Sequence, residues 1–248
     1  MDAWCRSSCC DRKTGNSHAM SGQTMTTDLT NWAGVPRPTR HVMEGRYTRL
    51  EPLDPARHEA DLLRSAQEPG ADDRFRYLFE TTPADAASFH AWIEKAATSE
   101  DPLFFAVIDK ATGRAEGRQA LMRIDPAHGV IEIGSILWGP AIARTRVTTE
   151  ALYLFVSYVF DRLGYRRFEW KCNDLNGPSK RAAERFGFRF EGIFRNHMVA
   201  KGQNRDTAWF AITDADWPAI KAALEAWLKP GNFGPAGQQI AKLAAARA

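Results

Sequence analysis

The hydrophobic pattern between Gly45 and Leu228 changes repeatedly from one period to another, and this alternation limits the fold more than any other feature. A period of two residues is typical of strands, and a period of three to four is typical of helices. The first half contains a strand pattern, two helical patterns and then two strands around a turn: RYTRLEPL, PARHEADLLRSAQ, TPADAASFHAWIEKAATS and LFFAVIDKATGRAEGRQALMRID.

The second half continues the alternation. The segment HGVIEIGSILWG predicts a strand, a helix is expected from Thr148 to Leu163, and RRFEWKCN predicts the next strand. A short helix, a hairpin and a closing amphipathic helix follow: PSKRAAERFGF, FRNHMVAKGQNRDTAWFAIT and DADWPAIKAALEAWL. Because strands and helices are mixed along the chain, we expect one α/β (α+β) domain with a mixed sheet and helices on both faces.

The composition limits the classes of protein that need to be considered. The chain has 248 residues and a net charge of +3, which is too mild to indicate a nucleic-acid partner. No apolar run approaches the roughly 20 residues that span a bilayer, so no membrane partner is expected. Three of the four cysteines lie in the first ten residues and only Cys172 lies in the patterned region. This distribution predicts neither a disulfide framework nor a metal site, and it favours a reducing, cytoplasmic location.

The patterned region also sets the expected boundaries. Residues 1–40 are polar and unpatterned, and we interpret them as a disordered extension or a remnant of an upstream start. The domain is expected to span residues 41–229. Residues 230–248, which open with Pro230 and Gly231, are expected to form a loosely docked tail.

A basic loop stands between the strand that ends at Trp138 and the following helix. Arg144 and Arg146 lie immediately before the helix start, where the first backbone N–H groups have no intrahelical partners and the helix dipole adds positive charge. This arrangement predicts an anion site. An ordinary basic turn ahead of a buried helix explains the same residues, and the loop alone leaves both interpretations open.

Three motifs in order decide between them: EIG leading to GP and a helix with TEAL, the strand end NDLNGPS, and AAERFGFRFEG. Together they resemble the GNAT acetyltransferase superfamily, in the branch of the RimJ and RimL ribosomal-protein N-terminal acetyltransferases. The resemblance covers roughly Gly45 to Trp217. It implies a mixed sheet of about six to seven strands in which two central parallel strands, Val130–Trp138 and Arg167–Asn173, splay apart.

The resemblance also implies that acetyl-CoA lies in this splay as co-substrate, with its pyrophosphate on the loop before the long helix. The family writes that loop Gln/Arg-x-x-Gly-x-Gly/Ala, whereas this chain has Ala143 at the first position, Arg146 at the glycine position and Thr148 at the last. Charge-assisted bonds from the arginines would compensate for the missing glycine. The cofactor-binding residues expected from the resemblance are Ile136, Leu137, Trp138, Arg144, Thr145, Arg146, Val147, Thr148, Thr149, Asn176 and Ser179.

The expected chemistry is direct attack of a primary amine on the thioester in a ternary complex. Glu132 on the central strand is predicted to be the general base, with Glu169 as the alternative, which its alternation places on the opposite, solvated face. Backbone N–H groups of the Ile136–Trp138 segment are expected to stabilise the oxyanion. The resemblance also implies that Asn176 and Ser179 stand beside the pantetheine arm and the sulfur, so Ser179 is predicted to donate to the departing thiolate. Many members of the superfamily use a tyrosine for that task, and the corresponding stretch Ala182–Phe188 has none.

The acceptor stays open between a peptide N-terminus, an amino acid, a polyamine and an antibiotic, and His197 is one candidate to line its pocket. The alternative function is a non-catalytic acyl-CoA-binding module. A homodimer is expected, because four apolar residues in the hairpin and tail lack an obvious place inside one domain: Ile193, Phe194, Met198 and Phe233.

Overall fold

The computed structural model of the chain describes residues 28–243. The chain divides between Trp32 and Ala33 into two units, and of the first only a short turn at residues 28–32 is described. The cysteine cluster predicted to be unstructured lies outside the described residues. All elements of the fold belong to the second unit.

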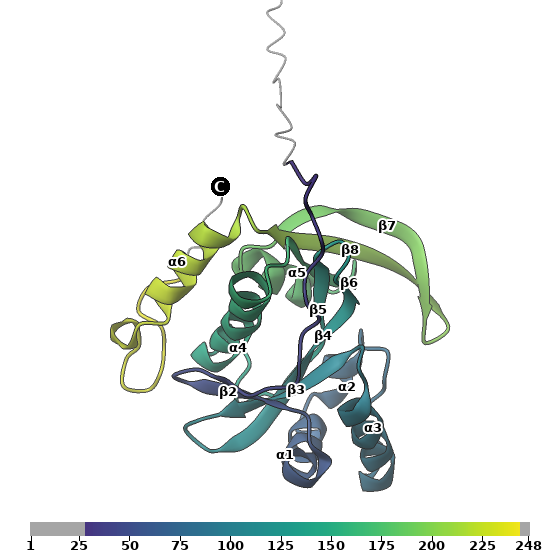
Figure 1. Cartoon of the computed structure of the whole chain (residues 1–248). Helices are drawn as coiled ribbons and strands as arrows, with labels where there is room; N and C mark the ends of the chain where they lie inside the picture. The colour runs from purple at the N-terminus through teal and green to yellow at the C-terminus, as the bar shows by residue number, and fades with distance from the viewer. Residues whose placement is uncertain (1–27, 244–248) are drawn as a thin grey trace, which may run out of the picture. The chain divides into compact units, whose positions relative to one another are not determined.

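An eight-stranded sheet forms the centre of this unit, in the order β1-β2-β3-β4-β5-β6-β8-β7 (Figure 1). The strands are β1 Met43–Glu44, β2 Thr48–Pro52, β3 Leu103–Asp109, β4 Arg114–Asp125, β5 Val130–Trp138, β6 Arg167–Asn173, β7 Arg189–Ala200 and β8 Gln203–Thr213. The expected mixed sheet is confirmed. It has one strand more than the six to seven predicted, because the two residues of β1 are too few to show an alternation.

The helices are α1 Pro55–Gln67, α2 Ala71–Phe75, α3 Ala86–Thr98, α4 Arg146–Ser157, α5 Gly177–Arg185 and α6 Trp217–Trp227, with a π-helical turn η1 Tyr158–Arg162 and a 3-10 turn η2 Pro230–Asn232. They cover both faces of the sheet (Figure 1). Leu62, Phe89 and Ile93 from α1 and α3 pack on one face. Leu152 and Phe155 from α4 pack on the other face, in the larger core that α6 also joins.

The two central parallel strands separate part of the way along their length. β5 and β6 pair from Val130↔Arg167 to Ile133↔Trp170. Beyond these positions β5 stays paired with β4, and β6 stays paired with β8. The predicted splay is therefore present, and it starts after Ile133 and Trp170.

The first and last described residues of this unit pack on its core. Residues 33–40, which the sequence assigned to the extension, contribute Val35 to the edge of the larger core and the Thr39 N–H to the Tyr158 hydroxyl at 3.0 Å. In the tail, Trp227 Nε1 donates to Gln239 Oε1 at 3.1 Å and to the Ala241 carbonyl at 3.0 Å. The tail is thus more firmly docked than its Pro-Gly opening predicts, because it closes around Trp227.

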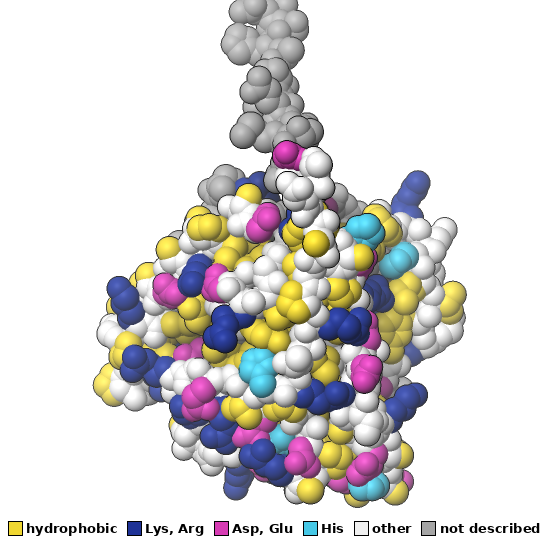
Figure 2. Space-filling view, viewed as in Figure 1, with side chains coloured by type: hydrophobic (Ala, Val, Ile, Leu, Met, Phe, Trp, Pro, Cys, Tyr) yellow, Lys and Arg dark blue, Asp and Glu magenta, His cyan; other side chains and the backbone are white. Residues whose placement is uncertain are grey.

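The hairpin of β7 and β8 extends well beyond the rest of the sheet (Figure 1). Of the four apolar residues expected to be exposed, Ile193 and Phe194 are 44% and 52% exposed. Met198 is half-buried, and Phe233 packs edge-on against Tyr47 and Trp227. On the face shown in Figure 2, basic and acidic side chains are intermixed.

Candidate active site

A large cavity of about 1240 Å³ opens where β5 and β6 separate. Its walls come from the segment after α2, the two splayed strands, the start of α4, α5 and the β7–β8 hairpin. Residues that represent these walls are Tyr77, Glu132, Trp138, Arg144, Lys171, Ser179 and Arg205. The cavity therefore joins the loop before α4, the expected base and the α5 motif in one site.

The loop before α4 is closed by its own residues. Thr145 is the N-cap of α4, and its Oγ1 accepts the Val147 N–H at 3.1 Å while donating to the Ile142 carbonyl at 2.7 Å. Threonine suits this position because its hydroxyl satisfies one of the otherwise unpaired first-turn donors. The Val147 N–H is thereby taken, which leaves the neighbouring first-turn N–H groups as candidate anion donors.

The two loop arginines have different environments. Arg144 is exposed, lines the cavity and has a left-handed backbone with φ of 64°. Arg146 is the first residue of α4, and its guanidinium lies 4.4 Å from the Tyr47 ring centroid and 5.3 Å from that of Phe233. The left-handed position of the loop is thus Arg144, not the motif's glycine position, and the Arg146 side chain is engaged with the tail.

The other expected cofactor residues fall into two groups. Val147 and Thr149 are buried, and the Thr149 hydroxyl donates to the Thr145 carbonyl at 3.2 Å. Ile136, Leu137, Trp138 and Thr148 line the cavity. The Trp138 indole donates to Gln119 Oε1 at 3.2 Å, which fixes the ring in the cavity wall.

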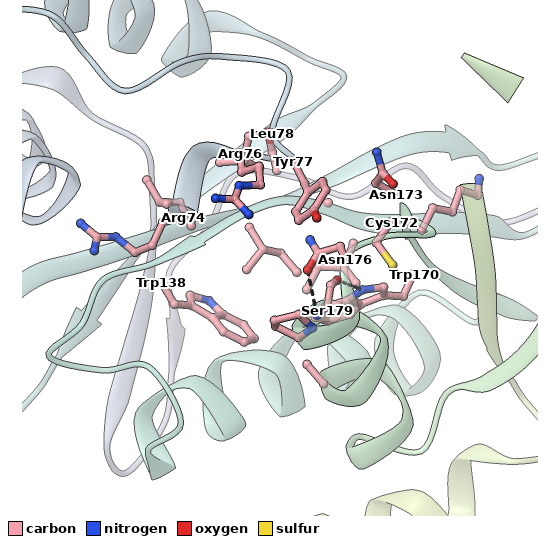
Figure 3. A pocket seen from close by; sticks show the side chains of 18 of the residues that line it. Arg74, Arg76, Tyr77, Leu78, Trp138, Trp170, Cys172, Asn173, Asn176 and Ser179 are labelled. Carbon is pink, nitrogen blue, oxygen red and sulfur yellow. Dashed lines mark hydrogen bonds between the residues drawn. The ribbon is translucent and has the colours of Figure 1, made fainter. Parts of the chain in front are cut away.

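The α5 motif combines capping with a place in the cavity. Asn176 is the N-cap of α5, and its Oδ1 accepts the Ser179 N–H at 3.1 Å. Ser179 Oγ accepts the Trp170 indole N–H at 2.9 Å (Figure 3). Since the indole occupies an acceptor lone pair, the Ser179 hydroxyl keeps its proton available for donation. Burial raises the pKa of the nearby Cys172 thiol, which is unfavourable for a thiolate nucleophile.

The expected base lies deep in the cavity wall. Glu132 is 4% exposed, with Oε2 3.0 Å from Lys171 Nζ and 3.5 Å from Arg123 Nε. Burial raises the pKa of this carboxyl, and the two cations offset part of that effect. Its other oxygen, Oε1, lies above Gly134, where an added Cβ would be 3.3 Å away. The Glu132 carboxylate therefore has a raised affinity for a proton and lies in the wall of the cavity.

The predicted position of Glu169 on the opposite, solvated face is wrong. Glu169 is buried, and it shares Lys171 with Glu132, since Lys171 Nζ lies 2.6 Å from Glu169 Oε2. Glu132 and Glu169 are register partners in the parallel pair and lie on the same face. The alternation along β6 predicted the wrong environment because side chains cover both faces of this central strand.

A buried arginine holds the backbone at the start of the splay. Arg118 on β4 donates from Nη1 to the Ser135 carbonyl at 2.7 Å and pairs with Glu80. Ser135 itself is left-handed, with φ of 51°, within strand β5. Arg118 also stacks on Trp92, with 4.4 Å between its Cζ and the ring centroid. The turn of β5 away from β6 is therefore fixed from behind by a charged group.

Three residues of the cavity were not predicted from the sequence to belong to the site. Tyr77 reaches from the segment after α2 towards Asn176, and its hydroxyl donates to the Leu175 carbonyl at 3.2 Å (Figure 3). Lys171 and Arg205 line the wall near Glu132. Alternation along RRFEWKCN was the available signal for Lys171, because it has the same parity as Glu169. Arg205, from the hairpin, is 8% exposed and lines the cavity.

Within residues 28–243, no group of three or more His, Cys, Asp or Glu side chains is arranged to hold a metal ion. In the same range no helix is both long enough and apolar enough to cross a membrane.

Comparison with known proteins gives consistent matches. Residues 48–189 match the family model described as the acetyltransferase (GNAT) domain. A GCN5-related N-acetyltransferase from Brucella melitensis is 62% identical, with a TM-score of 0.85 over 87% of this chain and 97% of that one. The uncharacterized N-acetyltransferase p20 of Bacillus licheniformis is 30% identical over 117 residues, which are 46% of this chain and 63% of that protein, less than two thirds of its length.

A more distant structure shares the fold alone. It is an acetyltransferase from Salmonella typhimurium that modifies the N-terminal serine of ribosomal protein L7/L12. It is 16% identical, with a TM-score of 0.61 over 70% of this chain and 99% of that one.

Proposed function

Because the chain belongs to the GNAT acetyltransferase family, we propose that it transfers an acetyl group from acetyl-CoA to a primary amine by direct attack in a ternary complex. The observation that carries this proposal is the cavity at the splay of β5 and β6, which is continuous from the start of α4 to Glu132. Such a cavity can hold two substrates end to end, with the reacting atoms between the separated strands.

The residues at the α4 end suit the phosphates of the co-substrate. First-turn N–H groups of α4 and the exposed guanidinium of Arg144 supply partial and full positive charge in one place. The backbone of Thr145–Thr149 would contribute N–H groups, since the side chains of Val147 and Thr149 are buried. On the strand side, Ile136, Leu137 and Trp138 would flank the pantetheine arm.

The acetyl group would lie beside the free edge of β5. The pairing of β5 with β6 ends at Ile133, so the backbone beyond it can direct N–H groups to the acyl oxygen. Arg118 maintains this course through its bond to the Ser135 carbonyl. Preorganised donors of this kind cost no rearrangement during the reaction.

Proton transfer would involve residues on either side of the acetyl group. Glu132 takes the proton of the incoming ammonium, directly or through water, and its raised pKa makes it a stronger base than an exposed glutamate. Ser179 donates its hydroxyl proton towards the departing sulfur, while Trp170 holds its oxygen in place. Asn176, which caps α5, orients the Ser179 backbone and would contact the pantetheine arm.

One observation favours the alternative of a non-catalytic acyl-CoA-binding module. Glu132 is already engaged by Lys171 at 3.0 Å, and a base held in an ion pair has less freedom to accept a proton. The two functions are separated by calorimetry with acetyl-CoA together with thiol release across amino acids, polyamines, aminoglycosides and peptides. Binding without thiol release from any amine supports the module, and thiol release with an acetylated product supports the transferase.

We further propose a homodimer formed through β7, which is an edge strand of the sheet. Four apolar side chains on β7 are exposed: Phe190, Ile193, Phe194 and Val199. An exposed edge strand that carries several exposed apolar side chains favours pairing with a second copy. Light scattering tests this directly, because a mass that stays near the 27.8 kDa of one chain at all concentrations refutes the dimer.

A further inference from the structure

One cation in the cavity, Arg205, has no anionic partner among the described residues that surround it. Arg205 on β8 is 8% exposed and lines the cavity on the side of Glu132. Within residues 28–243, no carboxylate lies within ion-pair distance of its guanidinium, and its buried Nε has no hydrogen-bond partner. Burying a guanidinium without an anion is unfavourable, so this arrangement indicates a ligand that supplies one.

The neighbouring charges are already balanced without Arg205. Lys171 lies between Glu132 and Glu169, with 3.0 Å and 2.6 Å to their nearest oxygens. Arg123 adds a contact to Glu132, and Arg167 pairs with Glu169 and Glu191. Three cations therefore face three carboxylates in this network, and Arg205 remains as one uncompensated positive charge. One uncompensated charge suits a monoanion.

The surroundings of Arg205 leave its fork available to a ligand. Its Cζ lies 5.0 Å from the centroid of the Phe79 ring, which covers one part of the guanidinium with an apolar surface. His197 beside it is bound through Nδ1 to Thr207 Oγ1 at 3.0 Å, and burial lowers its pKa, as do the nearby charges of Arg123, Arg205 and Lys171. With His197 neutral, and with Lys171 and Arg123 paired to Glu132, Arg205 is the cation at this wall that has no carboxylate partner.

We propose that Arg205 binds a carboxylate carried by the acceptor, so that the acceptor is a small molecule of the amino-acid class with a primary amine and a carboxylate. This inference rests on the proposed function. The amine would lie near Glu132 and the carboxylate at Arg205, since both line one cavity. A planar guanidinium matches a carboxylate with two parallel hydrogen bonds, which fixes the direction of the amine as well as binding the acid.

The test uses acceptors in matched pairs that differ only in the carboxylate. We would compare L-phenylalanine with L-phenylalaninamide, L-methionine with L-methioninamide, and 4-aminobutyrate with n-butylamine, each at equal concentration of free amine. Thiol release gives kcat/KM for each compound. We expect the acid of at least one pair to be preferred by about 10- to 100-fold, the range for one charge-assisted contact.

Variants of Arg205 then test whether this residue causes the preference for the acid. Arg205→Met keeps the length and apolar stem of the side chain, and it should bring the ratio within the pair to about one. Arg205→Lys should restore part of the ratio. Arg195→Met, at an exposed arginine of the same hairpin, is the matched control and should leave the ratio unchanged. Thermal unfolding of each variant separates loss of the contact from loss of the fold.

Each outcome decides the proposal. A wild-type ratio near one in every pair, or a preference that persists in Arg205→Met, overturns it while leaving the transferase function intact. If acetyl-CoA binds and no amine is acetylated, the proposed function fails instead. Calorimetry with the same acids then judges the Arg205 site by itself: binding that Arg205→Met abolishes supports the site, and no binding to the wild type overturns it.

Discussion

Glu150 is the residue whose replacement tests most directly how α4 is held. Its carboxylate is buried and accepts three backbone N–H groups from the segment that leads into β2. Oε1 accepts from Arg46 at 2.9 Å, and Oε2 accepts from Tyr47 at 2.6 Å and from Thr48 at 2.8 Å. Glu150→Ala removes all three acceptors and leaves the donors behind.

The expected loss of stability follows from this geometry. A hydrogen bond to a charged group contributes about 1.5–3 kcal/mol, and a buried donor left unpaired costs about 1–3 kcal/mol. Thr48 is fully buried, whereas Tyr47 is half-buried and Arg46 is exposed, so water can replace part of what these two residues lose. We therefore expect Glu150→Ala to lower the free energy of unfolding by about 3–5 kcal/mol rather than by three full contributions.

Urea unfolding followed by tryptophan fluorescence measures this free energy by linear extrapolation. Glu150→Gln, which keeps the shape but presents an NH₂ group to at least one donor, should lose about half as much. Glu225→Ala is the control, because that exposed carboxylate accepts one bond, from the Tyr153 hydroxyl at 2.7 Å. If Glu150→Ala stays within about 0.5 kcal/mol of the wild type with an unchanged slope, the three bonds do not hold α4.

Three other perturbations have defined outcomes. Glu132→Gln should lower kcat by roughly 10²–10⁴-fold. Since burial raises the Glu132 pKa, wild-type activity should rise with pH above the ordinary range of a glutamate, and the variant should lose that rise in a pH–rate profile. Arg144→Ala should weaken acetyl-CoA binding in calorimetry, whereas Arg146→Ala, which loses its stacking on Tyr47, should mainly lower the melting temperature; the reverse result would exchange their roles. Gly139→Ala should destabilise by about 1–3 kcal/mol in urea, because the new Cβ would meet Ser65 and lie 2.6 Å from the Glu116 carbonyl oxygen; full stability would mean that the loop moves freely.

Local patterns and motifs were sufficient for most of the fold. The alternation located seven of the eight strands and the long helices, and the motifs placed the splay on β5 and β6. Contacts between residues far apart in the sequence could not be predicted in this way. Arg146 lies against Phe233 from the tail, and no local pattern connects two residues so far apart.

The candidate site was predictable where one motif carried several of its residues. Asn176 and Ser179 belong to one capping turn, so their relation follows from their spacing. Glu132, Lys171 and Arg205 come from three strands, and their meeting depends on register. Alternation gives the face of a strand only when one face is exposed. Here the face of Glu169 and Lys171 is covered by side chains of neighbouring strands, such as Glu132 and Trp209. The burial of these residues and of Arg205 therefore does not follow from the pattern of one strand.

The short pairing between β5 and β6 has a consequence for how the molecule responds to its ligands. Four register pairs, ending at Ile133↔Trp170, join the two parts of the sheet through their backbones. A molecule that forms hydrogen bonds with both separated strands would link the two parts of the sheet where their own pairing ends. Ligand binding would then slow amide hydrogen exchange in both parts, including at residues that do not contact the ligand.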